Sequence, residues 1–139
     1  MYTAVDLSKY IVSKCYDDGY PITNLQLQKI LYYIQREYLQ SDAVAFSDSI
    51  EAWRFGPVVA DSYYHFCGFG AMPITTSYSI DISPEDAEII DKIVEDKRVL
   101  KPWDLVAATH KPGGAWDMIY NEGKGDKKVI PEALIKAVG

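Results

Sequence analysis

Residues 23–40 carry the strongest local folding signal in the sequence. Thr23 and Gln26 have the spacing of a capping box, in which each side chain satisfies a free backbone amide at a helix start. The residues that follow are apolar over most of a helical circumference and leave only a narrow polar strip. A helix of this kind is packed by neighbours on more than one side. We therefore predict that this segment forms the central helix of the fold. Its apolar positions are Leu25, Leu27, Ile30, Leu31, Tyr32, Ile34, Tyr38 and Leu39.

Helix-start and helix-stop residues divide the rest of the chain into short segments. Thr3 and Ser83 are suited to cap two further helices, and Gly56-Pro57 is expected to open another, because proline fits the first helical position. Later helices are predicted over 102–110, 115–120 and 131–138. The fold class is therefore mainly α, a compact bundle of about six or seven short helices around a central helix, with a small β-hairpin element.

The hairpin is predicted from two short extended runs, Val44–Phe46 and Ile50–Phe55. They flank the segment Ser47-Asp48-Ser49, whose residues favour a turn. Residues 74–80 alternate between apolar and hydroxyl side chains, which allows a strand without requiring one. Residues 123–128 are expected to form a polar bend.

Length and composition narrow the class of protein further. The chain has 139 residues, 48% of them hydrophobic, and a formal net charge of −6. This size predicts one domain over residues 1–139, and the acidity disfavours a uniformly basic nucleic-acid binder. No basic region precedes an apolar run at the start, so we expect no secretory signal and a cytoplasmic location. Cys15 and Cys67 are accordingly expected to be free, buried thiols.

No pattern in the sequence predicts a reactive site. His65 and Cys67 lack a second ligand pair, and Gly123–Lys128 lacks the spacing of a phosphate-binding loop. We therefore expect no metal, no cofactor and no catalytic residues, and predict that the protein is not an enzyme. An enzyme that uses Cys67 or His110 remains an alternative. Lysine and arginine at positions 97, 98 and 101 leave DNA binding open as another, although no helix-turn-helix pattern accompanies them.

Aromatic residues are unusually frequent, at 13% of the chain, with 11 tyrosines. Trp53, Arg54 and Phe55 stand directly before Gly56-Pro57. Tryptophan and arginine are enriched among residues that dominate binding energies in interfaces. For Arg54 a core ion pair and an interface contact are equally good explanations, whereas Trp53 is better explained as a core residue.

Two long motifs resemble those of the Panacea (SocA-like) antitoxin domain family, also known as phage-associated GepA-like proteins. The first is ITNLQLQKILYY at 22–33, and the second is IEAWRFGPVV at 50–59. Thr109-His110 ahead of Trp116 matches a third, shorter pattern. The resemblance spans roughly residues 3–138. Phe55 stands where the family often has tyrosine, and Ile30 where it has leucine.

The resemblance implies a function that composition does not. Members of this family are antitoxins of bacterial or prophage toxin–antitoxin pairs, which neutralise a partner toxin by protein–protein contact. One founding member delivers its toxin to a Clp-type protease as an adaptor. The family pairs one shared domain with unrelated toxins and has no established catalytic residues. Its motif positions are expected to be mostly structural here: Leu27, Gln28, Tyr32, Trp53, Gly56, Pro57, His110 and Trp116.

These observations together predict an antitoxin that binds a toxin encoded by a neighbouring gene. An acidic domain is suited to a basic partner, because complementary charge speeds encounter. We place the partner surface on or near five residues that combine aromatic rings and positive charge. They are Lys29, Tyr33, Arg54, Tyr63 and Tyr64. A DNA-binding transcriptional regulator is the first alternative, and a thiol or histidine enzyme the second.

Overall fold

The computed structural model describes all residues, 1–139, as seven α-helices, two short 3₁₀ helices and one three-stranded sheet. This confirms the mainly helical class with a small β element. The helices are α1 (Ala4–Asp17), α2 (Asn24–Gln40), α3 (Ala60–Phe66), η1 (Cys67–Phe69), α4 (Pro84–Arg98), α5 (Pro102–Thr109), α6 (Ala115–Tyr120), η2 (Asn121–Gly123) and α7 (Glu132–Val138). The strands are β1 (Glu51–Trp53), β2 (Gly56–Val58) and β3 (Lys128–Val129).

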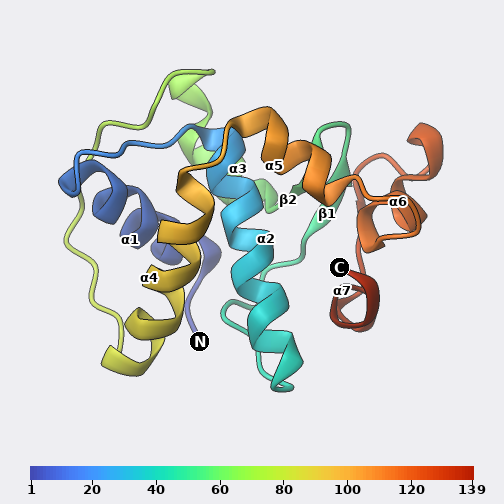
Figure 1. The fold of residues 1–139 in the computed structure, drawn as a ribbon, viewed down its shortest axis with the longest axis horizontal. Coiled ribbons are helices and arrows are strands. Elements are labelled where there is room, and N and C mark those ends of the chain that lie inside the picture. The colour runs from blue at the N-terminus through green and yellow to red at the C-terminus, as the bar shows by residue number, and fades with distance from the viewer.

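Helix α2 stands at the centre of the molecule, as predicted (Figure 1). It packs against α1, α3, α4, α5, α7 and β2, which together surround it. Its start is the expected capping box. Thr23 Oγ1 accepts a hydrogen bond from the Gln26 amide over 3.2 Å, and Gln26 Oε1 accepts one from the Thr23 amide over 2.9 Å. Two otherwise free amides are thereby satisfied, which fixes where α2 begins.

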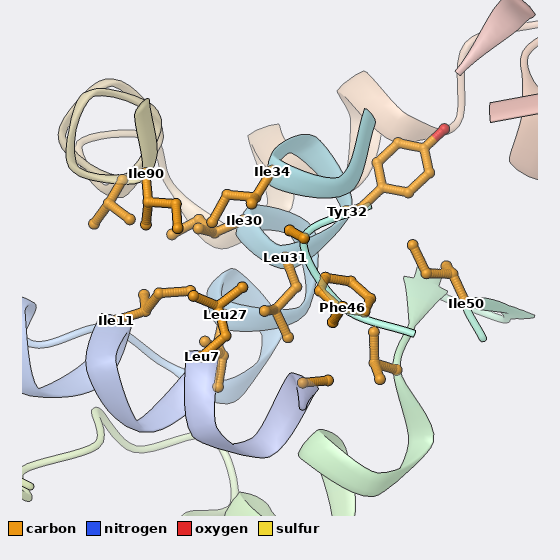
Figure 2. Packing of buried hydrophobic residues seen from close by; sticks show 14 of the residues in the cluster. Leu7, Ile11, Leu27, Ile30, Leu31, Tyr32, Ile34, Phe46, Ile50 and Ile90 are labelled. Carbon is orange, nitrogen blue, oxygen red and sulfur yellow. The ribbon is translucent and has the colours of Figure 1, made fainter. Parts of the chain in front are cut away.

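The two apolar stripes of α2 contact different neighbours (Figure 2). Ile30 and Ile34 point toward Ile90 of α4, while Leu27 points toward Leu7 and Ile11 of α1. On the remaining side, Leu31 and Tyr32 lie near Phe46 and Ile50, which stand ahead of β1. All of these side chains belong to one hydrophobic core of 25 buried residues.

The predicted caps of two other helices are present. Thr3 Oγ1 accepts from the Asp6 amide over 3.1 Å at the start of α1, and Ser83 Oγ accepts from the Asp86 amide over 3.2 Å at the start of α4. The segments expected at 102–110, 115–120 and 131–138 are α5, α6 and α7, within one residue at each end. No helix is both long and apolar enough to cross a membrane.

The predicted position of the hairpin is wrong. Strand β1 pairs antiparallel with β2, so the turn lies at Arg54-Phe55 and not at residues 47–49. Gly56 has φ +113°, a conformation that non-glycine residues rarely adopt, and it begins β2 instead of opening a helix. Helix α3 starts only at Ala60. Its N-cap residue, Val59, makes no side-chain hydrogen bond to the helix.

The third strand is also absent from the sequence-based prediction. Lys128–Val129, expected in a bend, pairs antiparallel with β1 and completes the order β2-β1-β3. Residues 74–80 form no strand and run without regular structure. A two-residue strand leaves almost no periodic signal, so only its tertiary partner reveals it.

The two cysteines differ in their environment. Both are free thiols, and Cys15 is buried, but Cys67 is exposed. The expectation of a buried Cys67 is wrong because α3 ends at Phe66, and Cys67 starts the 3₁₀ turn η1, which leaves the core. Its Sγ donates a hydrogen bond to the carbonyl oxygen of Tyr64 over 3.1 Å.

Candidate partner-binding surface

Gln28 holds the start of α3 against α2 from inside the core. Its Oε1 accepts from the amide of Val59 over 3.0 Å, and its Nε2 donates to Asn24 Oδ1 and to Ser62 Oγ over 3.0 and 3.1 Å. Ser62 Oγ is in turn 2.7 Å from Ser8 Oγ on α1. A buried amide with both ends satisfied fixes the geometry of the elements it joins. Gln28 therefore sets where α3 leaves the sheet.

Lys29 is fully buried, at 0% exposure, between α2, β2 and α5. Lys29 is predicted on or near the partner surface, but it has no exposed surface of its own, because β2 and α5 cover that side of α2. Its Nζ donates to the carbonyl oxygen of Pro57 over 3.0 Å and forms no ion pair. Burial lowers the pKa of Lys29 to about 7, since the charged ammonium loses its hydration.

Gly56 allows the backbone of β2 to pass close to this lysine. A Cβ atom at position 56 would lie 2.8 Å from Lys29 Cε and 2.8 Å from Thr109 Oγ1. Any side chain there would displace the packed lysine or the end of α5. The glycine is therefore required both by its positive φ and by this contact.

His110 and Trp116 lie against each other next to the hairpin. Their rings are stacked, with centroids 3.6 Å apart and planes 7° apart. Trp116 Nε1 donates to the carbonyl oxygen of Trp53 over 2.7 Å, which ties α6 to β1. Burial lowers the pKa of His110, and the nearby positive charge of Lys29 lowers it further. Of the other motif residues, Leu27 and Tyr32 lie in the hydrophobic core.

Three aromatic side chains form a cluster on the outer side of β1 and α3, which we call the aromatic cluster: Trp53, Tyr63 and Tyr64. The Trp53 and Tyr63 ring centroids are 5.0 Å apart, and those of Tyr63 and Tyr64 are 5.6 Å apart. Tyr64 is 58% exposed, whereas Trp53 and Tyr63 are half-buried. Trp53 is thus not the core residue expected from sequence, because it is the last residue of β1 and lies next to the exposed hairpin turn.

A groove of about 550 Å³ adjoins this cluster, and we call it the hairpin groove. Phe55 and Trp103 pack edge to face at its rim, with ring centroids 5.2 Å apart and exposures of 44% and 60%. Arg54 is exposed, and its guanidinium lies 5.3 Å from the centre of the Phe55 ring. The groove is lined by Asn24, Leu25, Gln28, Lys29, Trp53, Arg54, Phe55, Val58, Tyr63, Gly70, Ala71, Trp103, Asp126 and Lys127.

The structure brings together some of the predicted partner residues and separates others. Arg54 and Tyr63 line the hairpin groove, and Tyr64 stands beside them in the aromatic cluster. Tyr33 does not line the groove, and the Nζ of Lys97 from α4 covers its ring at 4.1 Å. Sequence reasoning missed Trp103. The signal that could have pointed to it is a tryptophan between Pro102 and Asp104, polar and helix-starting neighbours that favour an exposed first turn.

The site contains no group of three histidine, cysteine or acidic side chains positioned to hold a metal ion, and neither does the rest of the chain. Of the basic residues that suggested DNA binding, Arg98 is engaged within the molecule. Its guanidinium forms an ion pair with Asp18 over 2.7 Å. The arrangement offers rings and charges for contact with a partner.

Comparison with known proteins assigns the chain to a family. The family model for the Antitoxin SocA-like, Panacea domain matches residues 27–117, which include β1, β2 and α5. The chain belongs to the SocA-like Panacea domain family.

A curated relative of this Panacea-domain chain is Antitoxin SocA from Caulobacter vibrioides. The two are 32% identical over 115 residues, which are 73% of this chain and 61% of the relative. The Panacea chain thus spans less than two thirds of that relative. No solved structure matches this chain. Trp53, Tyr63 and Trp103 lie within the region that the family model matches, whereas Lys127 lies beyond it.

Proposed function

We propose that this protein is an antitoxin that neutralises a partner toxin by direct protein–protein binding in the cytoplasm. Family membership supports a toxin as the partner. The observation that carries the binding mode is the aromatic cluster with Arg54 beside it. Tyr64 and Arg54 are exposed there beside the half-buried rings of Trp53 and Tyr63. Tryptophan, tyrosine and arginine contribute most to binding energies at interfaces.

The test is co-expression of this chain with the product of the neighbouring open reading frame. Growth should be arrested by that product alone and rescued by the pair, and the two proteins should co-purify. Arg54→Ala and Tyr64→Ala should each weaken binding by at least about fivefold, as expected for contact residues. Lys92→Ala and Tyr16→Ala change exposed residues of similar chemistry on α4 and α1, and should leave binding unchanged.

Two outcomes would contradict this function. Absence of any complex, together with growth that co-expression does not rescue, would reject toxin neutralisation by binding. Full rescue by both Arg54→Ala and Tyr64→Ala, with affinity unchanged, would reject the surface while leaving the function intact. Folding of each variant is checked by its thermal melting curve, so that weak binding by a variant that fails to fold is not taken as the loss of a contact residue.

We further propose that the same complex is delivered to a Clp-type protease. The pairing of one founding family member with such a protease supports this step. The toxin should then disappear in a translation-blocked chase only when both this chain and the protease are present. A toxin that stays bound and stable in that chase would show neutralisation by sequestration alone, and would reject the adaptor role.

A further inference from the structure

The hairpin groove is built from segments that are far apart in the chain. Helix α2 contributes four residues, and the Arg54-Phe55 turn and α5 supply the rim. Residues 126 and 127 add a further segment. Phe55 and Trp103 present their rings to solvent at 44% and 60% exposure. Such a pair costs hydration free energy in the free protein, and an apolar side chain packed against the rings would remove that cost.

The charges along the groove have the opposite sign to those of the whole chain. Arg54, Lys127 and Lys29 line it together with a single acid, Asp126, although the formal net charge of the protein is −6. None of the three basic residues forms an ion pair within the chain, whereas Lys14, Arg98 and Lys136 all do. Arg54 and Lys127 are therefore exposed cations of the groove that have no ion-pair partner within the chain.

Lys127 is positioned by its backbone. It adopts φ +65°, uncommon for a residue with a Cβ atom, and its amide donates to the carbonyl oxygen of Ala52 over 2.6 Å. This conformation places its Nζ 5.4 Å from the centre of the Trp53 ring. The backbone of Lys127 is thus fixed against β1, which holds its side chain beside the ring of Trp53.

Lys29 lies beneath the lining of the groove and has no exposed surface of its own. The carbonyl oxygen of Pro57 is its one hydrogen-bond acceptor, and burial lowers the pKa of Lys29 to about 7. Near neutral pH its amine is therefore protonated in only part of the molecules. A negative charge bound in the groove would favour the protonated form of Lys29.

We propose that the hairpin groove binds an acidic segment of the toxin, in which an apolar or aromatic side chain packs against Phe55 and Trp103 while a neighbouring carboxylate pairs with Arg54 or Lys127. This inference rests on the proposed function, since it names the chemistry of the partner at the same surface. The net charge of −6 still favours a partner that is basic overall, because long-range attraction depends on total charge. The local charge of the groove decides which side chains fit it.

The experiment measures the dissociation constant between this chain and the co-encoded toxin by titration calorimetry. Lys127→Glu and Arg54→Glu should each weaken binding by at least about tenfold, as for charges paired within an interface. Trp103→Ala should weaken it to a similar degree. The matched control is Lys124→Glu, an exposed lysine of the same loop that does not line the groove, which should change affinity by less than about twofold.

A charge swap makes the test specific. A toxin variant with one acidic residue of the docking segment changed to lysine should bind Lys127→Glu or Arg54→Glu better than wild type does. Equal effects of Lys127→Glu and Lys124→Glu, or binding unaffected by any groove variant, would overturn the proposal. Tyr64→Ala would still weaken the complex in that case if the proposed function holds.

A nucleotide is the competing kind of occupant, because rings and cations also bind bases and phosphates. AMP is the probe, and tryptophan fluorescence is the readout, because two of the three tryptophans, Trp53 and Trp103, line the groove. We expect no quenching by AMP at concentrations up to about a hundred times those at which the toxin binds. Quenching that is abolished by Trp103→Ala, together with displacement of the toxin, would assign the groove to a nucleotide and overturn the acidic-segment proposal.

Discussion

Lys29 donates a hydrogen bond to the carbonyl oxygen of Pro57 inside the core, 28 positions along the chain and with no carboxylate to balance its charge. The contact links the central helix to the strand that forms one side of the hairpin. It also makes the stability of the fold depend on the protonation of one amine, because burial holds the pKa of Lys29 at about 7.

Replacing Lys29 by methionine should change the pH dependence of folding. An unfolded lysine has a pKa of about 10.4, so between about pH 7 and 10 the unfolded chain binds more protons than the folded one at this residue. The free energy of unfolding of the wild type should therefore rise with pH relative to that of Lys29→Met, by up to about 1.4 kcal/mol per pH unit. Urea titrations at several pH values measure this difference. Lys92→Met, at an exposed site on α4, should keep the wild-type slope, and a Lys29→Met slope equal to it would contradict the assignment.

Replacing Gly56 by alanine should destabilise the protein by about 2 kcal/mol or more, because strain at φ +113° adds to the collision with Lys29 and Thr109. The control is Gly19→Ala, which has φ +73° but no atom within 4 Å of the added methyl group. It should cost only about 1 kcal/mol. Equal losses in chemical denaturation would mean that backbone strain alone explains the glycine.

Replacing Gln28 by leucine should cost about 2–4 kcal/mol, because the amide of Val59 would be left buried without an acceptor. Denaturant titration gives the free energy of unfolding. Gln40→Leu, at the exposed end of the same helix, should change it by less than about 0.5 kcal/mol. A Gln28→Leu variant as stable as wild type would show that solvent satisfies the start of α3.

Native protein should show one rapidly reacting thiol. Cys67 is exposed, whereas Cys15 is buried and its pKa is raised by that burial, so its thiolate is scarce. A thiol-reactive dye should label one site quickly, and Cys67→Ser should remove this phase. In denaturant both cysteines of the wild type should be labelled. Rapid labelling of native Cys67→Ser would place Cys15 at the surface.

Much of the helical framework is predictable because its signals are local. Thr23 with Gln26, and Ser83 ahead of Pro84, define helix starts within four residues of sequence. Sequence reasoning misplaces the hairpin because its local pattern has two interpretations. An extended run before Gly-Pro can end at the start of a helix, or it can be a strand that turns into a second strand. Only the pairing of Trp53 with Gly56 decides between them.

The candidate site is predictable only where one segment carries it. Arg54 and Tyr63 can be found because both lie close to the conspicuous hairpin motif. Lys29 is misjudged because helical periodicity reports the polarity of a face and not what packs on it. Trp103 and Lys127 reach the groove through tertiary contacts that no spacing in the sequence encodes.

The hairpin has a buried part, its strands, and an exposed part, the two-residue turn at Arg54-Phe55. Ala52 and Val58 on its strands are buried, while both residues of the turn are exposed. Substitutions at these two positions therefore change the proposed contact surface while leaving Ala52 and Val58 packed in the interior. A library randomised at these two positions alone is the natural starting point for redirecting the molecule to a new target.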